Sequence, residues 1–183
     1  MKQVLRSFFV QDTVTVAKKL LGKIIYVNGC TARITETEAY TDDSASHAFK
    51  KTERSKIMFD TYGQVYVYLI YGMYHCLNFT TEKKGKPGAV LIRAAEPLSG
   101  MELMKRKRGA EDLHNLCSGP GKLCQALGID KRHNNLALGK DVKIFDDGFL
   151  VGKIGKGSRI GIKDALHLQW RFFIDGNRFV SKV

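Results

Sequence analysis

The chain has 183 residues, which is enough for one well-packed core and short for two. Its 44% hydrophobic and 26% charged residues exclude a disordered chain, and it has no apolar run of bilayer-spanning length. A net charge of +12, from 30 Lys and Arg against 18 Asp and Glu, favours polyanionic partners, with nucleic acid ahead of acidic membrane.

The four cysteines show no CxxC pair and no zinc-like spacing, and we expect reduced thiols of a cytoplasmic protein. The N-terminal segment MKQVLRSFFVQDT lacks the apolar core and cleavage site of a secretory signal. Repeats, linkers and low-complexity segments are absent from the sequence. We therefore expect residues 1–183 to form a single domain.

The first predicted elements are a helix and a hairpin. Residues 12–21 fit a short helix, with Asp12 as its N-cap and Gly22 as its stop. After a short apolar strand, Asn28-Gly29 is the strongest hairpin signal in the chain. We expect the return strand to extend over residues 30–40.

The strand over residues 30–40 ends in acidic residues. Strict alternation predicts one face shared by Ala32, Ile34, Glu36, Glu38 and Tyr40. A carboxylate at the rim of an apolar face has a perturbed pKa, which suits a general base. Glu38 is therefore a candidate catalyst, although a solvated strand end also explains the pattern.

Residues 41–63 are polar and are predicted to form an irregular loop. The loop contains His47 and a basic run of Lys50, Lys51, Arg54 and Lys56. A loop of this length in a compact domain is usually functional or mobile.

The segment 65–80, VYVYLIYGMYHCLNFT, is predicted to be a hairpin with Tyr71 near its tip. The alternation places Tyr66, Tyr68 and Ile70 on one face. Flat amphipathic rings at these positions indicate a surface on which other flat rings, such as bases, can stack. An aromatic-rich sheet core is the alternative interpretation.

A buried strand over residues 89–95 contains Arg93, which we expect either to pair with a glutamate or to face a ligand. Residues 97–108 are predicted to form a helix that ends in four basic residues. In the segment CSGPGKLCQALG, Pro120 starts a helix, Gly128 ends it, and Lys122 in its first turn is a candidate phosphate contact.

The last third of the chain alternates short predicted strands with Gly-rich turns. The final segment, WRFFIDGNRFVS over residues 170–181, is predicted to form another hairpin. We expect an α+β fold with a curved, largely antiparallel sheet and short packed helices.

Aromatic rings, an acidic strand end, a buried arginine and strong positive charge together suit an enzyme that extrudes a base from nucleic acid. The sequence resembles the alkyladenine (3-methyladenine) DNA glycosylase family. The similarity is carried, in the family's order, by RITETEAY (33–40), YVYLIYGMYHCLN (66–78), LIRAAEPL (91–98), CSGPGKLCQAL (117–127), RIGI (159–162) and the C-terminal segment WRFFIDGNRFVS. Residues 52–57 depart from the family pattern.

The resemblance implies a role for each matched residue. Glu38 matches the general base that activates water, and Arg93 matches the arginine that positions this water. Tyr40 matches the ring on one face of the flipped base, and Tyr68 and His47 match those on the other. His47 would also hydrogen-bond the damaged base.

Two further matches concern DNA and selectivity. Tyr71 matches the side chain inserted into the minor groove, where it fills the space of the flipped nucleotide. Asn78 matches the residue whose clash with the exocyclic amino group excludes normal guanine.

The resemblance implies a monomeric, monofunctional glycosylase that starts base excision repair on damaged double-stranded DNA and needs no cofactor. Its substrates would be 3-methyladenine, 7-methylguanine, hypoxanthine and ethenoadenine. The implied fold resembles that of the C-terminal domain of methionyl-tRNA formyltransferase. The protein would be located in the cytoplasm, and associated with the nucleoid if the source is bacterial.

Two other functions fit parts of the sequence. A metal-dependent nuclease could use Glu36, Glu38 and His47 as ligands. A non-catalytic nucleic-acid-binding module could use the same fold, because a scaffold does not determine chemistry. The presence of Glu38, Arg93 and both stacking tyrosines argues against the second.

Overall fold

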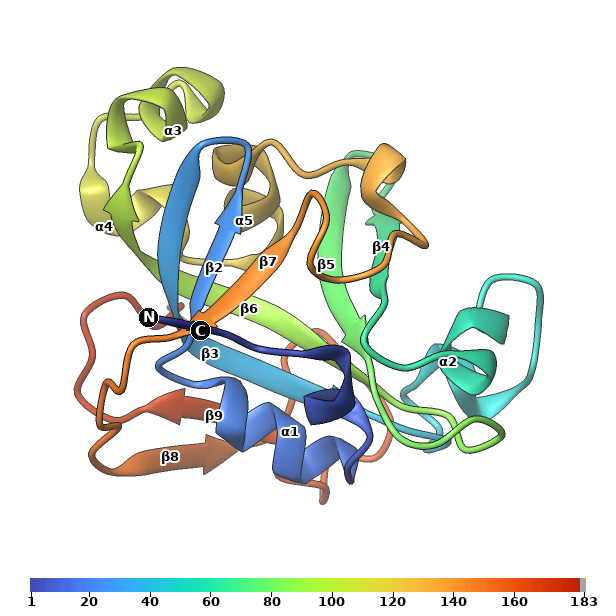
Figure 1. The fold of residues 1–183 in the computed structure, drawn as a ribbon. Helices are drawn as coiled ribbons and strands as arrows, with labels where there is room; N and C mark the ends of the chain where they lie inside the picture. The colour runs from blue at the N-terminus through green and yellow to red at the C-terminus, as the bar shows by residue number, and fades with distance from the viewer. Residues whose placement is uncertain (182–183) are drawn as a thin grey trace.

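The computed structural model describes residues 1–181, which form one α+β domain around an antiparallel sheet (Figure 1). The long strand β3 (Cys30–Tyr40) lies at the centre of the sheet. One edge of β3 pairs with β6 (Ala89–Ser99) along nearly its whole length. The other edge pairs first with β2 (Ile24–Val27) and then with β9 (Arg171–Ile174).

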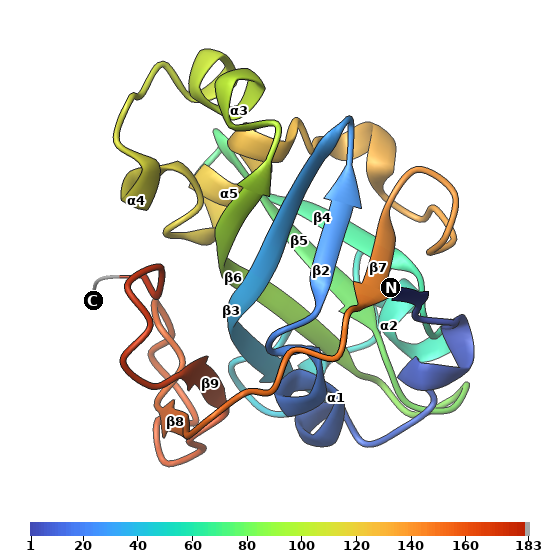
Figure 2. The same ribbon diagram turned by 60° about the vertical axis from the view of Figure 1, so that its left-hand side comes forward.

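The described residues contain nine strands, and the main path has the order β1-β7-β2-β3-β6-β5-β4. The remaining strands are β1 (Lys2–Gln3), β4 (Val65–Ile70), β5 (Tyr74–Thr80), β7 (Lys143–Asp146) and β8 (Ile154–Gly157), which pairs with β9. The sheet curls, so that β4 and β5 lie behind β2 and β3 in Figure 2. This architecture confirms the predicted fold class.

Short helices surround the curled sheet. The α-helices are α1 (Thr13–Leu20), α2 (Lys56–Asp60), α3 (Met101–Arg108), α4 (Leu113–Leu116) and α5 (Pro120–Leu127), and the 3-10 turns are η1 (Arg6–Phe9), η2 (His47–Phe49) and η3 (Lys131–His133). Helices α3, α4 and α5 gather beyond one end of β2 and β3 (Figures 1 and 2), and α5 packs on β5 and β6. Helix α1 packs on β3 and β6, and its buried residues join the main hydrophobic core.

Several predicted boundaries are confirmed. Asp12 caps α1 by accepting a hydrogen bond from the amide of Thr15 at 3.0 Å. Asn28 and Gly29 both adopt positive φ, as the tight turn between β2 and β3 requires. Gly128 ends α5 in the left-handed conformation.

Three sequence predictions are wrong. The predicted helix 97–108 begins only at Met101, because Pro97 is still part of β6. The predicted hairpin over 170–181 does not form, since β9 pairs with β3 and β8 instead. The predicted irregular loop 41–63 contains η2 and α2. In each case pairing or packing with distant residues outweighs the local pattern.

The side-chain alternation of β3 also differs from the prediction. Register irregularities occur between Ile34 and Thr37. As a result Ile34 and Ala39, which strict alternation would place on opposite faces, both belong to the main core. The shift separates the apolar start of the strand from its acidic end, so that Glu36 and Glu38 face polar partners.

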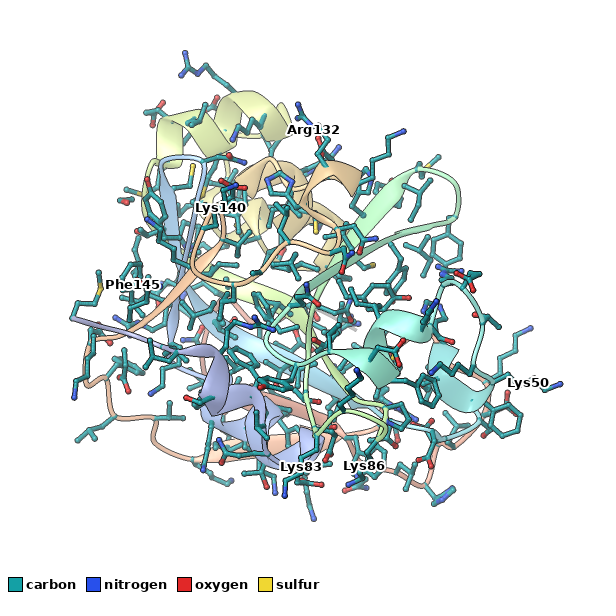
Figure 3. All side chains as sticks on the ribbon, turned by 45° about the vertical axis from the view of Figure 1, so that its right-hand side comes forward. Lys50, Lys83, Lys86, Arg132, Lys140 and Phe145 are labelled. Atoms are coloured by element: carbon teal, nitrogen blue, oxygen red, sulfur yellow. The ribbon has the colours of Figure 1, made fainter. Side chains whose placement is uncertain are left out.

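No helix in residues 1–181 is both long enough and apolar enough to cross a membrane. All four cysteines are buried free thiols. Exposed basic side chains extend from several sides of the molecule, as Lys50, Lys83, Lys86, Arg132 and Lys140 show in Figure 3. The net charge of the chain therefore does not indicate the charge of a particular cavity, which depends on the residues that line it.

Candidate active site

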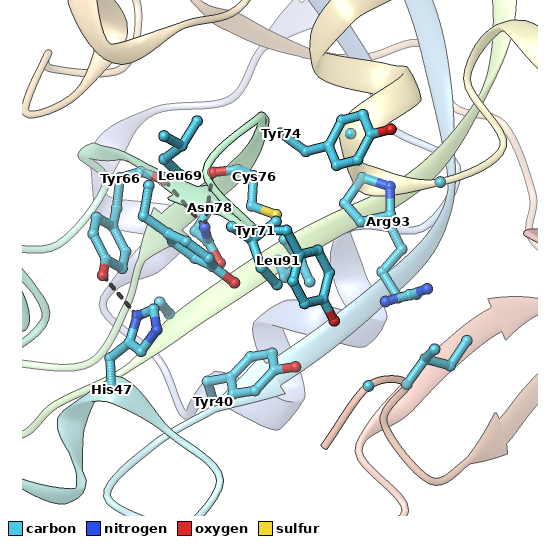
Figure 4. A pocket seen from close by; sticks show the side chains of 18 of the residues that line it. Tyr40, His47, Tyr66, Leu69, Tyr71, Tyr74, Cys76, Asn78, Leu91 and Arg93 are labelled. Carbon is cyan, nitrogen blue, oxygen red and sulfur yellow. Dashed lines mark hydrogen bonds between the residues drawn. The ribbon is translucent and has the colours of Figure 1, made fainter. Parts of the chain in front are cut away.

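A cavity of about 900 Å³ opens between the β4–β5 hairpin, the segment after β3 and the start of α5. Every site residue predicted from the sequence lines it except Glu38. Five tyrosines contribute to the wall: Tyr40, Tyr66, Tyr68, Tyr71 and Tyr74. Tyr40, His47, Asn78 and Arg93 surround the same space in Figure 4. A pocket lined by flat rings suits a flat, partly polar ligand.

Glu38 lies directly behind this lining and is completely buried. Its Oε1 accepts a hydrogen bond from the amide of Ile160 at 2.7 Å and lies 3.4 Å from Nη1 of Arg93. Its Oε2 accepts a hydrogen bond from the Tyr40 hydroxyl at 2.8 Å. Burial raises the pKa of Glu38, and Arg93, the Ile160 amide and the Tyr40 hydroxyl partly offset this rise. The three groups that hold Glu38 all belong to residues of the cavity wall.

Arg93, on β6, joins two carboxylates. Its Nε donates to Oε1 of Glu36 at 3.3 Å, and its Nη1 pairs with Glu38. The sequence left open whether Arg93 pairs with a glutamate or faces a ligand. The structure shows the pairing with glutamate, and Arg93 also lines the cavity. Glu36 additionally accepts from Nη1 of Arg171 at 3.3 Å and from the amide of Ser181 at 2.9 Å.

Tyr68 and His47 form one aromatic cluster of the cavity. Their ring centroids are 4.6 Å apart with an interplanar angle of 75°. The Nδ1 atom of His47 is 2.9 Å from the hydroxyl of Tyr66, an interaction that is drawn dashed in Figure 4. Burial, aided by the charge of Arg54, lowers the pKa of His47 to about 4. His47 is therefore a neutral imidazole at physiological pH.

Tyr71 projects from the tip of the β4–β5 hairpin and is 77% exposed. Tyr71 and Gly72 have φ angles of 53° and 70°, and the amide of Met73 donates to the carbonyl of Ile70 at 3.2 Å. Such a turn normally uses Asn, Asp or Gly at its first central position. A tyrosine held in this conformation is strained, and strain of this kind clusters at functional sites.

Asn78 is buried on β5 at the wall of the cavity. Its Nδ2 donates to the carbonyl of Tyr66 at 3.1 Å and to the carbonyl of Cys76 at 3.2 Å. These two bonds fix the orientation of the amide. A rigid side chain can exclude a ligand by steric clash, because it has no alternative position.

Lys122 lies in the first turn of α5 and lines the cavity. Its Nζ donates to Oδ1 of Asn115. The neighbouring Gly121 allows close packing against the hairpin, since a Cβ atom at this position would lie 3.1 Å from Tyr74. The start of α5 therefore supports the hairpin as well as contributing positive charge to the rim.

Arg159 has a structural role that sequence reasoning missed. Its side chain is fully buried, donates to the carbonyl of Ala39 at 3.0 Å and pairs with Asp43. Its guanidinium carbon lies 4.6 Å from the centroid of the Tyr40 ring. The RIGI segment that contains Arg159 had shown a family resemblance, but nothing local indicates that it packs against residues about 120 positions earlier.

The ligand set of the metal-dependent nuclease is engaged in other contacts. Glu36 and Glu38 pair with Arg93, while His47 contacts Tyr66. Within residues 1–181, no three His, Cys, Asp or Glu side chains gather in a group that could hold a metal ion.

Comparison with known proteins is consistent with this geometry. The sequence model of the family described as "Methylpurine-DNA glycosylase (MPG)" matches residues 7–178. A Rhizobium etli protein is 50% identical over 181 residues, covering 97% of this chain and 88% of its own length. A Clostridium perfringens protein (strain 13) is 46% identical over 200 residues, covering 97% and 98%. Both carry the name "Putative 3-methyladenine DNA glycosylase".

Proposed function

The chain belongs to the methylpurine-DNA glycosylase family and is a DNA glycosylase, and from this premise we propose that it is monofunctional and acts on duplex DNA with alkylated or deaminated purines. It flips the damaged purine into the tyrosine-lined cavity and hydrolyses its N-glycosidic bond. The observation that carries this proposal is the buried Glu38–Arg93 pair, in which Arg93 lines that cavity and Glu38 lies directly behind it.

In the proposed binding step, Tyr71 enters the minor groove and fills the space left by the flipped nucleotide. Its position at an exposed hairpin tip supports this role. The base then stacks between Tyr40 on one side and Tyr68 with His47 on the other. Asn78 disfavours guanine bases, whose exocyclic amino group would meet its fixed amide. 7-Methylguanine carries the same group but is still excised, because its cationic base leaves readily, whereas normal guanine does not.

In the proposed chemical step, a water molecule enters beside Glu38 and donates a hydrogen bond to its carboxylate. Arg93 positions this water. As the bond between the base nitrogen and C1′ breaks, positive charge develops on the sugar, and the carboxylate of Glu38 stabilises it. Water then bonds to C1′ and gives its proton to Glu38. The raised pKa of Glu38 suits it for accepting this proton.

The surrounding charge supports binding to DNA. The net charge of +12 attracts the duplex over a long range, and Lys122 at the rim of the cavity is a candidate phosphate contact. We propose that the protein acts as a monomer in the cytoplasm, at the nucleoid if the source is bacterial.

The test is excision by the Glu38→Gln variant. Duplexes that carry one hypoxanthine or one 7-methylguanine are incubated with excess protein, and alkali then reveals abasic sites. We expect a loss of at least about 100-fold in rate, because the general base is removed. Affinity for the damaged duplex, measured by gel shift, should change little. Glu111→Gln, on a side chain that is 88% exposed, is the matched control.

Three results would contradict parts of the proposal. A Glu38→Gln protein that excises as fast as wild type would exclude Glu38 as the base. A wild-type protein that binds damaged duplexes yet releases no base from any of them would favour the non-catalytic binding module. A covalent DNA adduct trapped by borohydride would contradict the monofunctional assignment, because only an amine nucleophile forms such an adduct.

A further inference from the structure

The lining of the cavity is positively charged. It includes Arg54, Arg93, Arg108 and Lys122, and no Asp or Glu from residues 1–181 reaches its surface. Arg93 is neutralised by the carboxylates behind it. Arg108, at the end of α3, and Lys122, in the first turn of α5, donate to the uncharged side chains of Gln125 and Asn115 and keep their charge. Of the cations in this lining without a carboxylate partner among the described residues, Arg54 is the one that contacts a ring of the aromatic cluster.

Arg54 lies against the aromatic cluster that would hold the base. Its guanidinium carbon is 5.1 Å from the centroid of the Tyr68 ring, and its Nη2 donates to the carbonyl of Leu69 at 3.4 Å. No carboxylate among the described residues forms an ion pair with it. Its charge also helps to keep His47 neutral by lowering the pKa of that imidazole, after the larger effect of burial. This wall therefore combines a neutral imidazole, His47, with a cation, Arg54.

The two classes of damaged purine respond differently to a cation at this place. When the bond from N9 to C1′ breaks, its electron pair moves to the purine. A neutral purine such as hypoxanthine leaves as an anion, unless a proton reaches it first. A cationic purine such as 7-methylguanine leaves as a neutral molecule. A nearby positive charge assists bond breaking in both classes, because the purine gains one negative charge in each. Relative to free protein and DNA, however, it stabilises the transition state more for the neutral lesion.

The difference between the two classes lies in the binding of the intact lesion. A cationic base next to Tyr68 meets electrostatic repulsion from Arg54. It also competes with that guanidinium for the π electrons of the ring, which attract cations. A neutral base meets neither cost.

We propose that Arg54 is a specificity-determining residue that favours neutral purine lesions over cationic ones. This inference rests on the proposed function of the cavity. The sequence resemblance implies both substrate classes without ranking them, whereas the position of Arg54 beside Tyr68 ranks them. We take a separation of about 8 Å between the Arg54 guanidinium and a base stacked on Tyr68, and an effective dielectric constant of about 20. With solvent screening of the exposed arginine, the charge changes the ratio of excision rates about three- to tenfold.

The test compares excision of hypoxanthine and of 7-methylguanine from duplexes of otherwise identical sequence at subsaturating protein, where the rate reports kcat/KM and so includes binding of the lesion. The measured quantity is the ratio of the two rates for each protein. Arg54→Gln, which removes the charge, should lower the ratio of hypoxanthine to 7-methylguanine excision about three- to tenfold. Arg54→Lys, which keeps it, should retain most of the ratio. Lys83→Gln removes one charge from an exposed turn outside the cavity (Figure 3) and should leave the ratio unchanged.

An equal loss for both lesions in Arg54→Gln would overturn the inference and would identify Arg54 as a general DNA contact. An unchanged ratio would overturn it as well. Failure of the proposed function looks different, because wild type would then release neither base. The lesion ratio therefore tests Arg54 separately from the catalytic assignment.

Discussion

Glu36 does not line the cavity, but its buried carboxylate holds Arg93 and Arg171 in place. The Glu36→Gln substitution removes this buried charge. The carboxylate of Glu36 is fully buried and accepts from Arg93, Arg171 and the amide of Ser181. Glutamine has nearly the same shape, so the substitution changes the charge with little change in packing. Two arginines would then lose a carboxylate that they share.

The magnitude follows from the burial of the partners. The side chains of Arg93 and Arg171 are only 8% and 13% exposed, so solvent screens their pairs with Glu36 weakly. Breaking a buried ion pair from one side costs about 3–5 kcal/mol. The amide oxygen of glutamine keeps part of the hydrogen bonding. We therefore expect a loss of about 3 kcal/mol in the free energy of unfolding, out of a total of about 5–15 kcal/mol.

The same substitution should move the pH dependence of excision. Burial raises the pKa of Glu38 most, and the negative charge of Glu36 adds to this rise. Without that charge the pKa of Glu38 falls. Since a general base works only when deprotonated, activity that is lost on acidification should persist to lower pH in Glu36→Gln than in wild type.

Urea unfolding measures the first effect, and the pH profile of single-turnover excision measures the second. Asp175→Asn is the control, because it breaks an exposed pair with Lys153 and should cost about 0.5 kcal/mol or less. Unchanged stability in Glu36→Gln would show that the buried network contributes nothing. An acid limb that stays in place or moves to higher pH would refute the electrostatic coupling between the two glutamates.

Three further predictions concern the cavity and the hairpin. Tyr40→Phe removes the hydroxyl that lowers the pKa of Glu38, so the acid limb of the pH profile should move to higher pH; a shift in the opposite direction would contradict the assigned hydrogen bond. Tyr71→Gly relieves a positive φ and should raise the free energy of unfolding by about 1 kcal/mol in urea, while base flipping, followed by 2-aminopurine fluorescence, is lost; retained flipping would exclude the wedge. Gly121→Ala places a Cβ atom 3.1 Å from Tyr74 and should lower the free energy of unfolding in urea by about 1–2 kcal/mol. Unchanged stability would show that the hairpin can move to accommodate the methyl group.

Local signals in the sequence determined many individual elements. The cap at Asp12, the Asn28-Gly29 turn and the stop at Gly128 each act within a few residues, and all three are found in the structure. The hairpin with Tyr71 at its tip was predicted in the same way, from alternation broken by a glycine. Backbone preferences and short-range hydrogen bonds suffice for such features.

Local signals failed where distant segments compete for the same backbone. Pro97 was predicted to start a helix, but the pairing of β6 with β3 extends the strand through it. The final turn Asp175-Gly176 was predicted to close a hairpin, but β9 is bound by β3 and β8. The irregular register in β3 also has no signature in the order of its side chains, because it depends on how β6 pairs with it.

The residue types of the site could be chosen from the sequence, but their connections could not. Alternation and composition indicated Glu38, Arg93 and the tyrosines as unusual, and the family resemblance added His47 and Asn78. Only the folded chain brings the amide of Ile160 onto Glu38 and the guanidinium of Arg159 against Tyr40, across more than 110 residues. Electrostatic coupling depends on distance in space and on burial, and neither quantity is encoded locally. The sequence therefore determined which ionisable groups are present, whereas the tertiary structure decided which of them are close enough to interact electrostatically.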